Sequence, residues 1–343
     1  MSAPATSAPG KTAEQIIAFS ISYERDTLLR RGMGYDHLRE LLIRLARRIL
    51  RRRISVAYGG NWRRTEQNFT FELLNLIADE QADSTSGGTD TGRAIGRLYN
   101  HSSWPNYLDV TTQVEAQWIN SCRVIRVTQQ QAGFAGDEVV SDEDAPWKMR
   151  FRDPRTMFNA AATLSAMRRL MMGATEIHVP DVPAPEKVPA VAARILLGGG
   201  VERYSGFVPG IFEEALATLE HGKPAYILGG FGGAAEVLSD AILAPGTERP
   251  ERLTLEWHKE HNERLSELLD SSEMFPPPRQ FRSTKKLLDD LYAFVLNARA
   301  DLPNTLRTGL DGPETRELMT TRDIATAVRL VRKGLASSLD IQP

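Results

Sequence analysis

Two glycine-rich turns that frame one amphipathic helix constrain the fold of this chain more than any other feature. An apolar run ends at Gly198, and a helix with two acidic residues in its first turn begins after Pro209. That helix ends near Gly222, and a second apolar run leads into another glycine cluster after Leu228. The order strand, glycine turn, helix, strand, glycine turn is typical of an α/β nucleotide-binding sheet.

Both turns place glycines at the carboxyl ends of strands. Where no Cβ is present, backbone N–H groups can approach a phosphate or a ribose closely. The alternative is that these glycines only make tight connections between strand and helix. We predict ligand contacts instead, because two such turns lie so close together. The glycines of this segment that we expect at the ligand are Gly198, Gly199, Gly200, Gly210, Gly230 and Gly232.

Composition excludes several classes of protein. The 343 residues are 41% hydrophobic and 25% charged, which is ordinary for a soluble globular chain. The net charge of −2 argues against a nucleic-acid polymer as partner. No apolar run approaches the roughly 18–20 residues that a membrane helix needs. The single cysteine, Cys122, excludes an internal disulfide and a cysteine-rich zinc site. We therefore expect a soluble protein of the reducing cytoplasm.

The apolar segments predict one doubly wound, mostly parallel, Rossmann-like α/β sheet, with the carboxyl ends of its strands opening into one crevice. Strands are expected at residues 16–21, 54–58, 123–128, 194–197 and 225–228. Apolar residues at spacings of three and four predict helices at 37–50, 70–79 and 159–172. The polar segment 81–106 is expected to be a long loop or an insertion, and 129–146 a mobile surface loop.

The chain divides into three parts by composition. Residues 1–13 are rich in alanine, proline and serine and are expected to form a disordered tail. Residues 14–245 carry all the strand signals and form the predicted sheet domain. Residues 246–343 are charged and lack strand signals, so we expect a C-terminal helical extension with helices at 253–269, 283–296 and 321–337.

Four segments together carry a family resemblance. They are FSIS in the first strand, AYGGN after the second, SAMRRLMM on a helix and PGIFEEA at the start of another helix. This ordered set resembles the SLOG superfamily, which includes the Lonely Guy phosphoribohydrolases and the ligand-sensing domains of several bacterial immune proteins. The resemblance covers about residues 15–243 and implies a nucleotide-binding domain. It implies that Ser20, Ser22, Gly59 and Gly60 lie at the ligand.

Lonely Guy enzymes have a Met-x-x-Arg-Lys-x-x-Met segment that supplies an arginine. Their Pro-Gly-Gly-x-Gly-Thr-x-x-Glu segment supplies phosphate-binding amides and a catalytic glutamate. The resemblance therefore implies that Arg168 is the functional arginine and Glu214 the glutamate, with Gly210 beside them. Here Ile211 replaces the threonine, Asn61 replaces a glycine after the second strand, and a longer loop replaces the compact Pro-Gly-Gly. These departures favour ligand binding over hydrolysis.

The same residues suit an anionic nucleotide on physical grounds. The helix that begins at Gly210 presents unpaired N–H groups and a partial positive charge. Glu213 and Glu214 either complement that dipole or accept hydrogen bonds from paired ribose hydroxyls. Arg168 either clamps a phosphate bidentately or remains a solvated charge on its helix.

We predict that the chain binds and senses a small nucleotide-derived ligand, ADP-ribose or an NAD-related signal, of the kind used in bacterial immunity and signalling. The alternative is a hydrolase of N-glycosidic bonds, acting on a nucleoside monophosphate or an NAD-like dinucleotide, in which Arg168 and Glu214 are catalytic. A third interpretation is an assembly protein whose SLOG fold has lost its ligand. No cofactor or metal is expected.

The resemblance also implies a homo-oligomer that pairs through helices beside the site. Helix 159–172 offers more apolar surface than one face needs, from Leu164, Met167, Leu170, Met171 and Met172. The alternative is that this helix is buried within one chain, between the sheet and the extension.

Three other motifs do not carry a function. APGKT at residues 8–12 lacks the strand and first glycine of a P-loop. The run 230–235 is close to a dinucleotide fingerprint, but it follows a late strand and no acid-tipped strand comes after it. His258 and His261 have a metal-ligand spacing without a third ligand nearby in sequence, so we expect a solvated helix face there.

Overall fold

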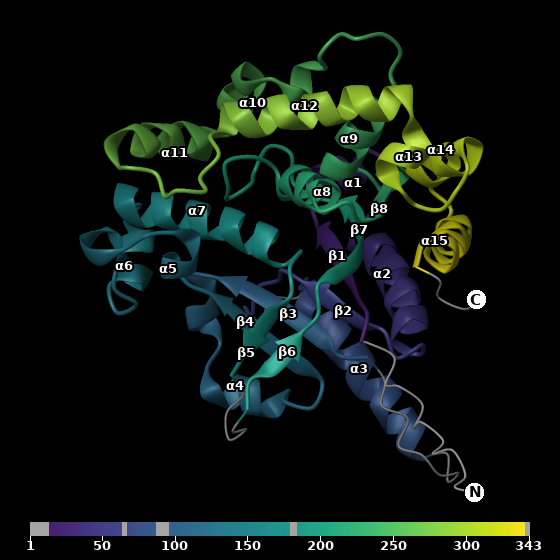
Figure 1. The fold of residues 1–343 in the computed structure, drawn as a ribbon, viewed down its shortest axis with the longest axis horizontal. Coiled ribbons are helices and arrows are strands. Elements are labelled where there is room, and N and C mark those ends of the chain that lie inside the picture. The colour runs from purple at the N-terminus through teal and green to yellow at the C-terminus, as the bar shows by residue number, and fades with distance from the viewer. Residues whose placement is uncertain (1–13, 64–66, 87–95, 179–183, 340–343) are drawn as a thin grey trace, which may run out of the picture.

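The computed structural model describes residues 14–63, 67–86, 96–178 and 184–339 (Figure 1). The predicted disordered tail, residues 1–13, lies outside the described residues. Within them, no helix is both long and apolar enough to span a membrane.

A six-stranded sheet with the order β4-β3-β2-β1-β7-β8 forms the centre of the molecule, and every neighbouring pair is parallel (Figure 1). Its strands are β1 (Ile16–Ser22), β2 (Ser55–Tyr58), β3 (Leu98–Ser103), β4 (Cys122–Val127), β7 (Val191–Gly198) and β8 (Ala225–Leu228). Because the chain runs outward from β1 to β4 and then returns to the other side of β1, the strand order reverses between β1 and β7. Ligand sites of such sheets lie at this reversal. The predicted doubly wound α/β fold is confirmed.

Helices cover both faces of the sheet (Figure 1). Ile17, Phe19 and Ile21 of β1 face the core shared with α2, α3 and α15. The alternate residues Ile16 and Ala18 face the other side, where α7 and α8 lie. The first helices are α1 (Arg25–Leu29), α2 (Tyr35–Leu50), α3 (Phe69–Ser86), α4 (Thr112–Gln117), α5 (Gln129–Ala132), α6 (Ala145–Arg150), α7 (Pro154–Leu170), α8 (Gly210–Glu220) and α9 (Gly233–Leu243).

The helices after Pro245 pack onto the same layers. They are α10 (Leu255–His261), α11 (Glu263–Met274), α12 (Thr284–Ala300), α13 (Leu302–Leu306), α14 (Gly312–Thr320) and α15 (Ile324–Leu339). Helix α12 lies over α8 and α9, α14 contacts β8, and α15 packs on α2 (Figure 1). The division of the chain at residue 245 stays a prediction.

Several predicted boundaries and loops are corrected by the structure. Strand β3 lies inside the segment 81–106 that we expected to be a loop, because its residues are buried although most of them are polar. Segment 129–146 is not wholly a loop: it contains α5 and the start of α6, and the Gln129 side chain binds the backbone of Val140 through both its amide atoms, at 2.7 and 3.0 Å. A break at Asn262 divides the helix expected at 253–269. Helix α15 begins at Ile324 and not at the expected residue 321. A short antiparallel hairpin, β5 (Thr175–Ile177) and β6 (Glu186–Val188), was not expected.

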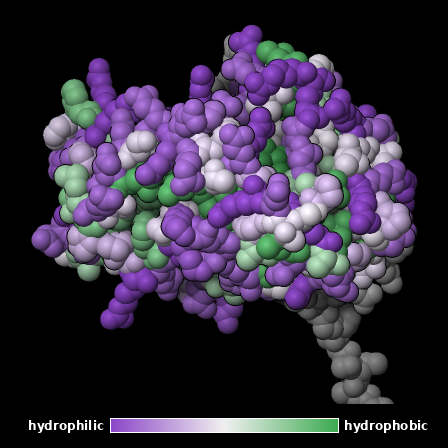
Figure 2. All heavy atoms as spheres, turned by 90° about the horizontal axis from the view of Figure 1, so that it is seen from above, coloured by the Kyte–Doolittle hydropathy of each residue, from purple (hydrophilic) through white to green (hydrophobic). Residues whose placement is uncertain are grey.

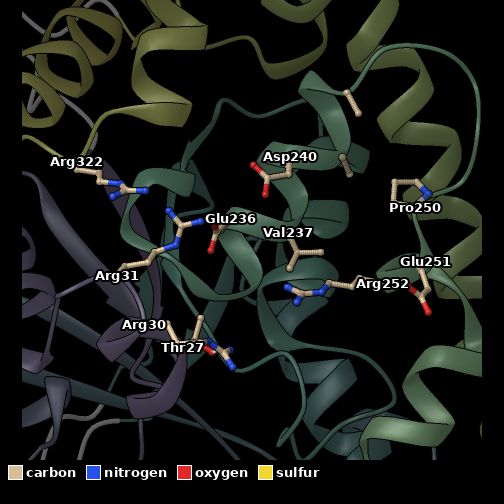
Figure 3. A pocket seen from close by; sticks show the side chains of 12 residues that line it. Thr27, Arg30, Arg31, Glu236, Val237, Asp240, Pro250, Glu251, Arg252 and Arg322 are labelled. Carbon is tan, nitrogen blue, oxygen red and sulfur yellow. Dashed lines mark hydrogen bonds and ion pairs between the residues drawn. The ribbon is translucent and has the colours of Figure 1, made fainter.

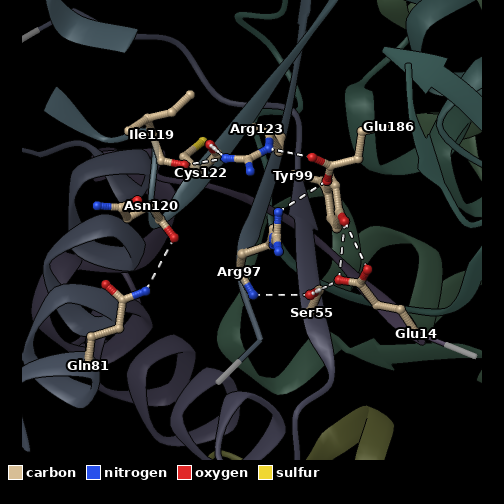
Figure 4. A network of polar contacts seen from close by, with 10 residues as sticks. All are labelled: Glu14, Ser55, Gln81, Arg97, Tyr99, Ile119, Asn120, Cys122, Arg123 and Glu186. Atoms are coloured by element: carbon tan, nitrogen blue, oxygen red, sulfur yellow. Dashed lines mark hydrogen bonds and ion pairs between the residues drawn. The ribbon is translucent and has the colours of Figure 1, made fainter. Parts of the chain in front are cut away.

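Charged side chains at the amino edge of the sheet are paired with one another (Figure 4). The carboxylate of Glu14, just before β1, accepts a hydrogen bond from the Tyr99 hydroxyl at 3.1 Å. Glu186 of β6 pairs with Arg97 at 3.1 Å and with Arg123 at 2.8 Å. These contacts join β3, β4 and the hairpin, so this edge is occupied by structural ion pairs and hydrogen bonds.

Helix α7 is covered within the chain. Met167, Met171 and Met172 are buried, and Leu170 is 43% exposed. The apolar surface that suggested an oligomer is therefore largely used inside the protomer. Seen from above α10–α12, the surface is mainly hydrophilic, with hydrophobic residues in small separate patches (Figure 2). The oligomeric state stays a prediction.

Gly230→Ala tests how tightly the C-terminal helices pack on the sheet. An added Cβ would lie 1.9 Å from the carbonyl oxygen of Thr321, directly after α14. Because backbone atoms cannot move aside cheaply, we expect the free energy of unfolding to fall by about 1–3 kcal/mol, measured by urea denaturation. Gly312→Ala, at the start of α14, is the control, since its Cβ would meet only the Arg316 side chain at 3.5 Å. Equal stability of the two variants would contradict this packing.

His258 lies buried among the rings of Tyr204, Phe212 and Trp257, so the expected solvated face is wrong for this histidine. Burial lowers its pKa to about 4. An unfolded chain binds a proton at this histidine below about pH 6.5, whereas the folded chain does so only near pH 4. The stability contributed by neutral His258 is therefore complete above pH 6.5 and is lost as the pH falls toward 4.

We accordingly expect the free energy of unfolding to fall on acidification by up to about 1.4 kcal/mol per pH unit through this one group. His258→Phe keeps a ring in the same place but removes the titration. The stability of the wild type relative to the variant, measured by denaturation between pH 7 and pH 4, should therefore fall as the pH falls. Parallel curves would contradict the role assigned to His258.

Candidate functional site

A cavity of about 360 Å³ opens at the carboxyl edge of the sheet. Ser22 at the end of β1, Gly59 and Gly60 after β2, and His101 of β3 contribute to its wall. The last residues of parallel strands meet at the same edge of a sheet, and this cavity lies beside the reversal between β1 and β7. The site is therefore where a doubly wound sheet is expected to bind a ligand.

Helices α7 and α8 contribute another part of the cavity wall. Met167 and Arg168 of α7 and Gly210 at the start of α8 line it. An added Cβ at Gly210 would lie 2.8 Å from Nη2 of Arg168, and one at Gly206 would lie 3.0 Å from Nη1. The two glycines therefore let the guanidinium lie directly against the backbone at the start of α8.

Arg168 and Glu213 form the closest ion pair at the site. Nη1 of Arg168 lies 2.6 Å from Oε2 of Glu213, whose side chain is fully buried. The other carboxylate oxygen of Glu213 is buried without a hydrogen-bond partner among the described residues. The arginine that the resemblance selected therefore pairs first with Glu213, not with Glu214.

Glu214 lies between two arginines, behind the cavity. Its carboxylate oxygens are 3.8 Å from Nε of Arg168 and 3.8 Å from Nη1 of Arg194. Glu214 does not itself line the cavity. Its charge adds to the desolvation that raises the pKa of the buried Tyr58 hydroxyl. In this arrangement Glu214 balances buried positive charge.

Arg194 of β7 is a fully buried cation that sequence analysis did not select. Its guanidinium donates hydrogen bonds to Ser20 and Thr218, both at 2.9 Å, and lies 3.2 Å from the sulfur atoms of Met171 and Met172. Burial lowers the pKa of Arg194, and the nearby Glu214 opposes this shift. Ser20, expected at the ligand, is buried and holds Arg194 instead.

The structure brings some of the predicted site residues to the cavity and not others. Those on its wall are Ser22, Gly59, Gly60, Arg168, Gly200 and Gly210. Those elsewhere are Ser20, Gly198, Gly199, Glu213, Glu214, Gly230 and Gly232. Gly199 adopts φ +94°, and an added Cβ there would meet Ile211, so this glycine allows α8 to pack closely on the turn after β7. Gly230 lies under Thr321, and Gly232 faces Leu28 of α1.

Sequence analysis missed eleven of the seventeen residues on the cavity wall. The missed residues are Asn61, Arg63, His101, Ser102, Ser103, Asn106, Leu164, Met167, Arg203, Tyr204 and Ser205. Three of them end β3, a strand that we expected to be loop. The signal that could have found them is the pair Ser102 and Ser103 after His101, because the first strand also ends in serines, Ser20 and Ser22.

The cavity wall has a distinct charge pattern. Arg63, Arg168 and Arg203 line it, and no carboxylate does so among the described residues. Burial lowers the pKa of His101 to about 3, with the positive charge of Arg194 acting in the same direction, so its imidazole is neutral at pH 7. The cavity thus offers cations, hydroxyls and backbone groups, which together suit an anionic ligand.

A larger hollow of about 760 Å³ lies between α1, α9 and the C-terminal helices (Figure 3). Four arginines and three acidic residues line it, and Arg31 forms an ion pair with Glu236. Burial lowers the pKa of Arg31, with Arg322 acting in the same direction, and burial raises that of Asp240. Charges of both signs thus share this hollow, so we place the candidate site in the cavity at the sheet edge.

Comparison with known proteins agrees with this architecture. The family described as SLOG cluster2 matches residues 11–180 and 186–318, which is most of the chain. The match includes the strands, the glycine turns and the helices that carry Arg168 and Gly210, and it continues into α14. No protein with a curated description matches the chain. This chain belongs to the SLOG cluster2 family.

Proposed function

We propose that this SLOG domain binds a small nucleotide-derived anion, ADP-ribose or an NAD-related signal, and acts as a sensor. The observation that carries the proposal is the charge pattern of the cavity at the sheet edge, where Arg63, Arg168 and Arg203 line the wall without a carboxylate among the described residues. Its volume of about 360 Å³ lies in the range of small-molecule sites. A phosphate is the ligand group that these cations favour.

The phosphate is proposed to lie between Arg168 and the start of α8. The first turn of a helix presents N–H groups without intrahelical partners, and the helix dipole adds partial positive charge. Gly210 lets both the guanidinium and a phosphate approach that turn. We assign ribose contacts to Ser22, Ser102 and Ser103 on the wall rather than to Glu214, because Glu214 lies behind Arg168.

A route from the cavity to the C-terminal helices supports sensing. Tyr204 lines the cavity, and its ring packs edge-on against His258 of α10, with centroids 5.6 Å apart. The Asn262 side chain, at the break between α10 and α11, donates a hydrogen bond to the backbone oxygen of Tyr204 at 3.4 Å. Ligand contact at this loop would therefore act directly on the helices after Pro245.

Hydrolysis of an N-glycosidic bond is the second candidate function. It is favoured by one observation, the position of Glu214 within 3.8 Å of Arg168. Such a reaction needs a carboxylate that stabilises an oxocarbenium-like transition state or orients water. Glu214 could take this role only if ligand binding drew it away from Arg194 toward the cavity.

The double variant Arg168→Met with Glu213→Gln tests the proposed phosphate contact. Replacing both partners removes the ion pair without leaving a buried, unpaired carboxylate. A charge-assisted hydrogen bond contributes roughly 1.5–3 kcal/mol, so affinity should fall about 10- to 150-fold. Calorimetry with AMP and ADP-ribose measures this change. Glu213→Gln alone keeps Arg168 and should retain most of the affinity. Unchanged affinity in the double variant would refute the contact.

Glu214→Gln separates binding from hydrolysis. The amide keeps the shape of the side chain but removes its charge, so a hydrolase would lose turnover while still binding the nucleotide. Under the sensor proposal we expect no release of free base by the wild type and only a small change in affinity in the variant. Chromatography of incubated AMP, NAD and ADP-ribose provides the readout. Base release by the wild type that disappears in Glu214→Gln would establish the hydrolase instead.

A further inference from the structure

A second cavity of about 330 Å³ adjoins the candidate site and meets it at His101, which lines both. Its floor is apolar, formed by Ile125 and Val127 of β4, and Leu170 at the end of α7 lies at its wall. An apolar floor of this kind suits a flat ring or the carbon face of a sugar. The second cavity lies over β4, between the ends of α7 and α8, and shares His101 with the first.

Arg169 is the cation of this second cavity. It follows Arg168 on α7, and consecutive helical residues point roughly 100° apart, which lets the two arginines line different cavities. Arg168 is paired with Glu213, whereas Arg169 makes no ion pair or hydrogen bond with any described residue. Burial lowers the pKa of Arg169, although its guanidinium remains charged at pH 7. A partly buried cation without a partner favours an external anion.

The rest of the wall contains no competing anion among the described residues. Gln131, His221 and Gln280 line the cavity with Arg169, and no carboxylate does. The two acidic residues of α8 whose charges act on Arg169, Glu213 and Glu220, are paired with Arg168 and Arg282. The cavity therefore combines hydrogen-bonding groups with one positive charge.

His101 lies at the junction of the two cavities. It is only 4% exposed, and its Nδ1 is buried without a hydrogen-bond partner among the described residues. An unsatisfied buried nitrogen is costly, and a small shift of the ring on ligand binding would let a polar ligand group supply its partner. The position of His101 thus points to a ligand that occupies both cavities at once.

We propose that the two cavities form one bipartite site for a pyrophosphate-linked ligand, with the proximal phosphate at Arg168 and the distal phosphate at Arg169. The ring or sugar attached to the distal phosphate lies on the floor formed by Ile125 and Val127. This inference rests on the proposed function and narrows its ligand class. A mononucleotide fills the first cavity alone, whereas an ADP-ribose-like molecule reaches both.

Arg169→Met tests the second cavity by calorimetry with two probes, AMP and ADP-ribose. Loss of the distal phosphate contact should weaken ADP-ribose about 10- to 150-fold and leave AMP within about two-fold. Arg279→Met, an exposed neighbour of Gln280 outside the cavity, is the matched control and should bind both probes normally. Arg168→Met with Glu213→Gln should weaken both probes. Thermal denaturation checks that each variant is folded.

Leu170→Glu offers a second test that does not depend on Arg169. Leu170 is 43% exposed, so the substitution is tolerated, and its carboxylate should repel a distal phosphate. We expect it to weaken ADP-ribose selectively, whereas the neutral Leu170→Gln should do so far less.

The outcomes separate this inference from the proposed function. Equal effects of Arg169→Met on AMP and ADP-ribose, or no effect on either, would overturn the second cavity while leaving nucleotide binding intact. Binding of AMP but not of ADP-ribose by the wild type would do the same. Wild-type protein that binds neither probe would overturn the proposed function and this inference with it.

Discussion

The buried guanidinium of Arg194 is the interaction on which the centre of this molecule depends. It joins β7 to β1 through Ser20, to α8 through Thr218 and to the end of α7 through two methionine sulfur atoms. A charge removed from water is costly unless it is paired and hydrogen-bonded. Glu214 supplies the negative charge that Arg194 needs, at 3.8 Å. The position of α8 over the sheet is therefore fixed by electrostatics as well as by apolar packing.

The same arrangement decides which charged groups reach the ligand cavity. Glu213 ends the first turn of α8 and Glu214 follows it. Glu213 pairs with Arg168, whereas Glu214 lies between Arg168 and Arg194. Neither carboxylate therefore lines the candidate cavity, whereas Arg168 does. At the opposite edge of the sheet, Glu14 and Glu186 are bound in structural contacts (Figure 4). At the carboxyl edge, by contrast, Arg63, Arg168 and Arg203 line the candidate cavity.

Much of the fold could be predicted from the sequence. Apolar runs located five of the six strands of the sheet, and the glycine turns indicated a doubly wound order, since these signals depend on local residue spacing. Strand β3 could not be found this way. Its sequence LYNHSS is largely polar, and its burial depends on partners from elsewhere, such as the Asn100 amide that binds the backbone of Gly60 and accepts from Trp62. No local pattern encodes such partners.

The candidate site, too, could be predicted from the sequence only in part. The sequence by itself determined the glycines as site candidates, because a ligand-binding turn has a local signature, and its resemblance to the SLOG superfamily selected Arg168. Only the tertiary structure decided that Gly60 and Gly210 line the cavity whereas Gly230 lies beneath Thr321. It also decided that Glu213 pairs with Arg168 and that Arg194 becomes a buried cation. The physical reason is that burial and charge pairing depend on distances between distant segments, which packing of the whole chain sets.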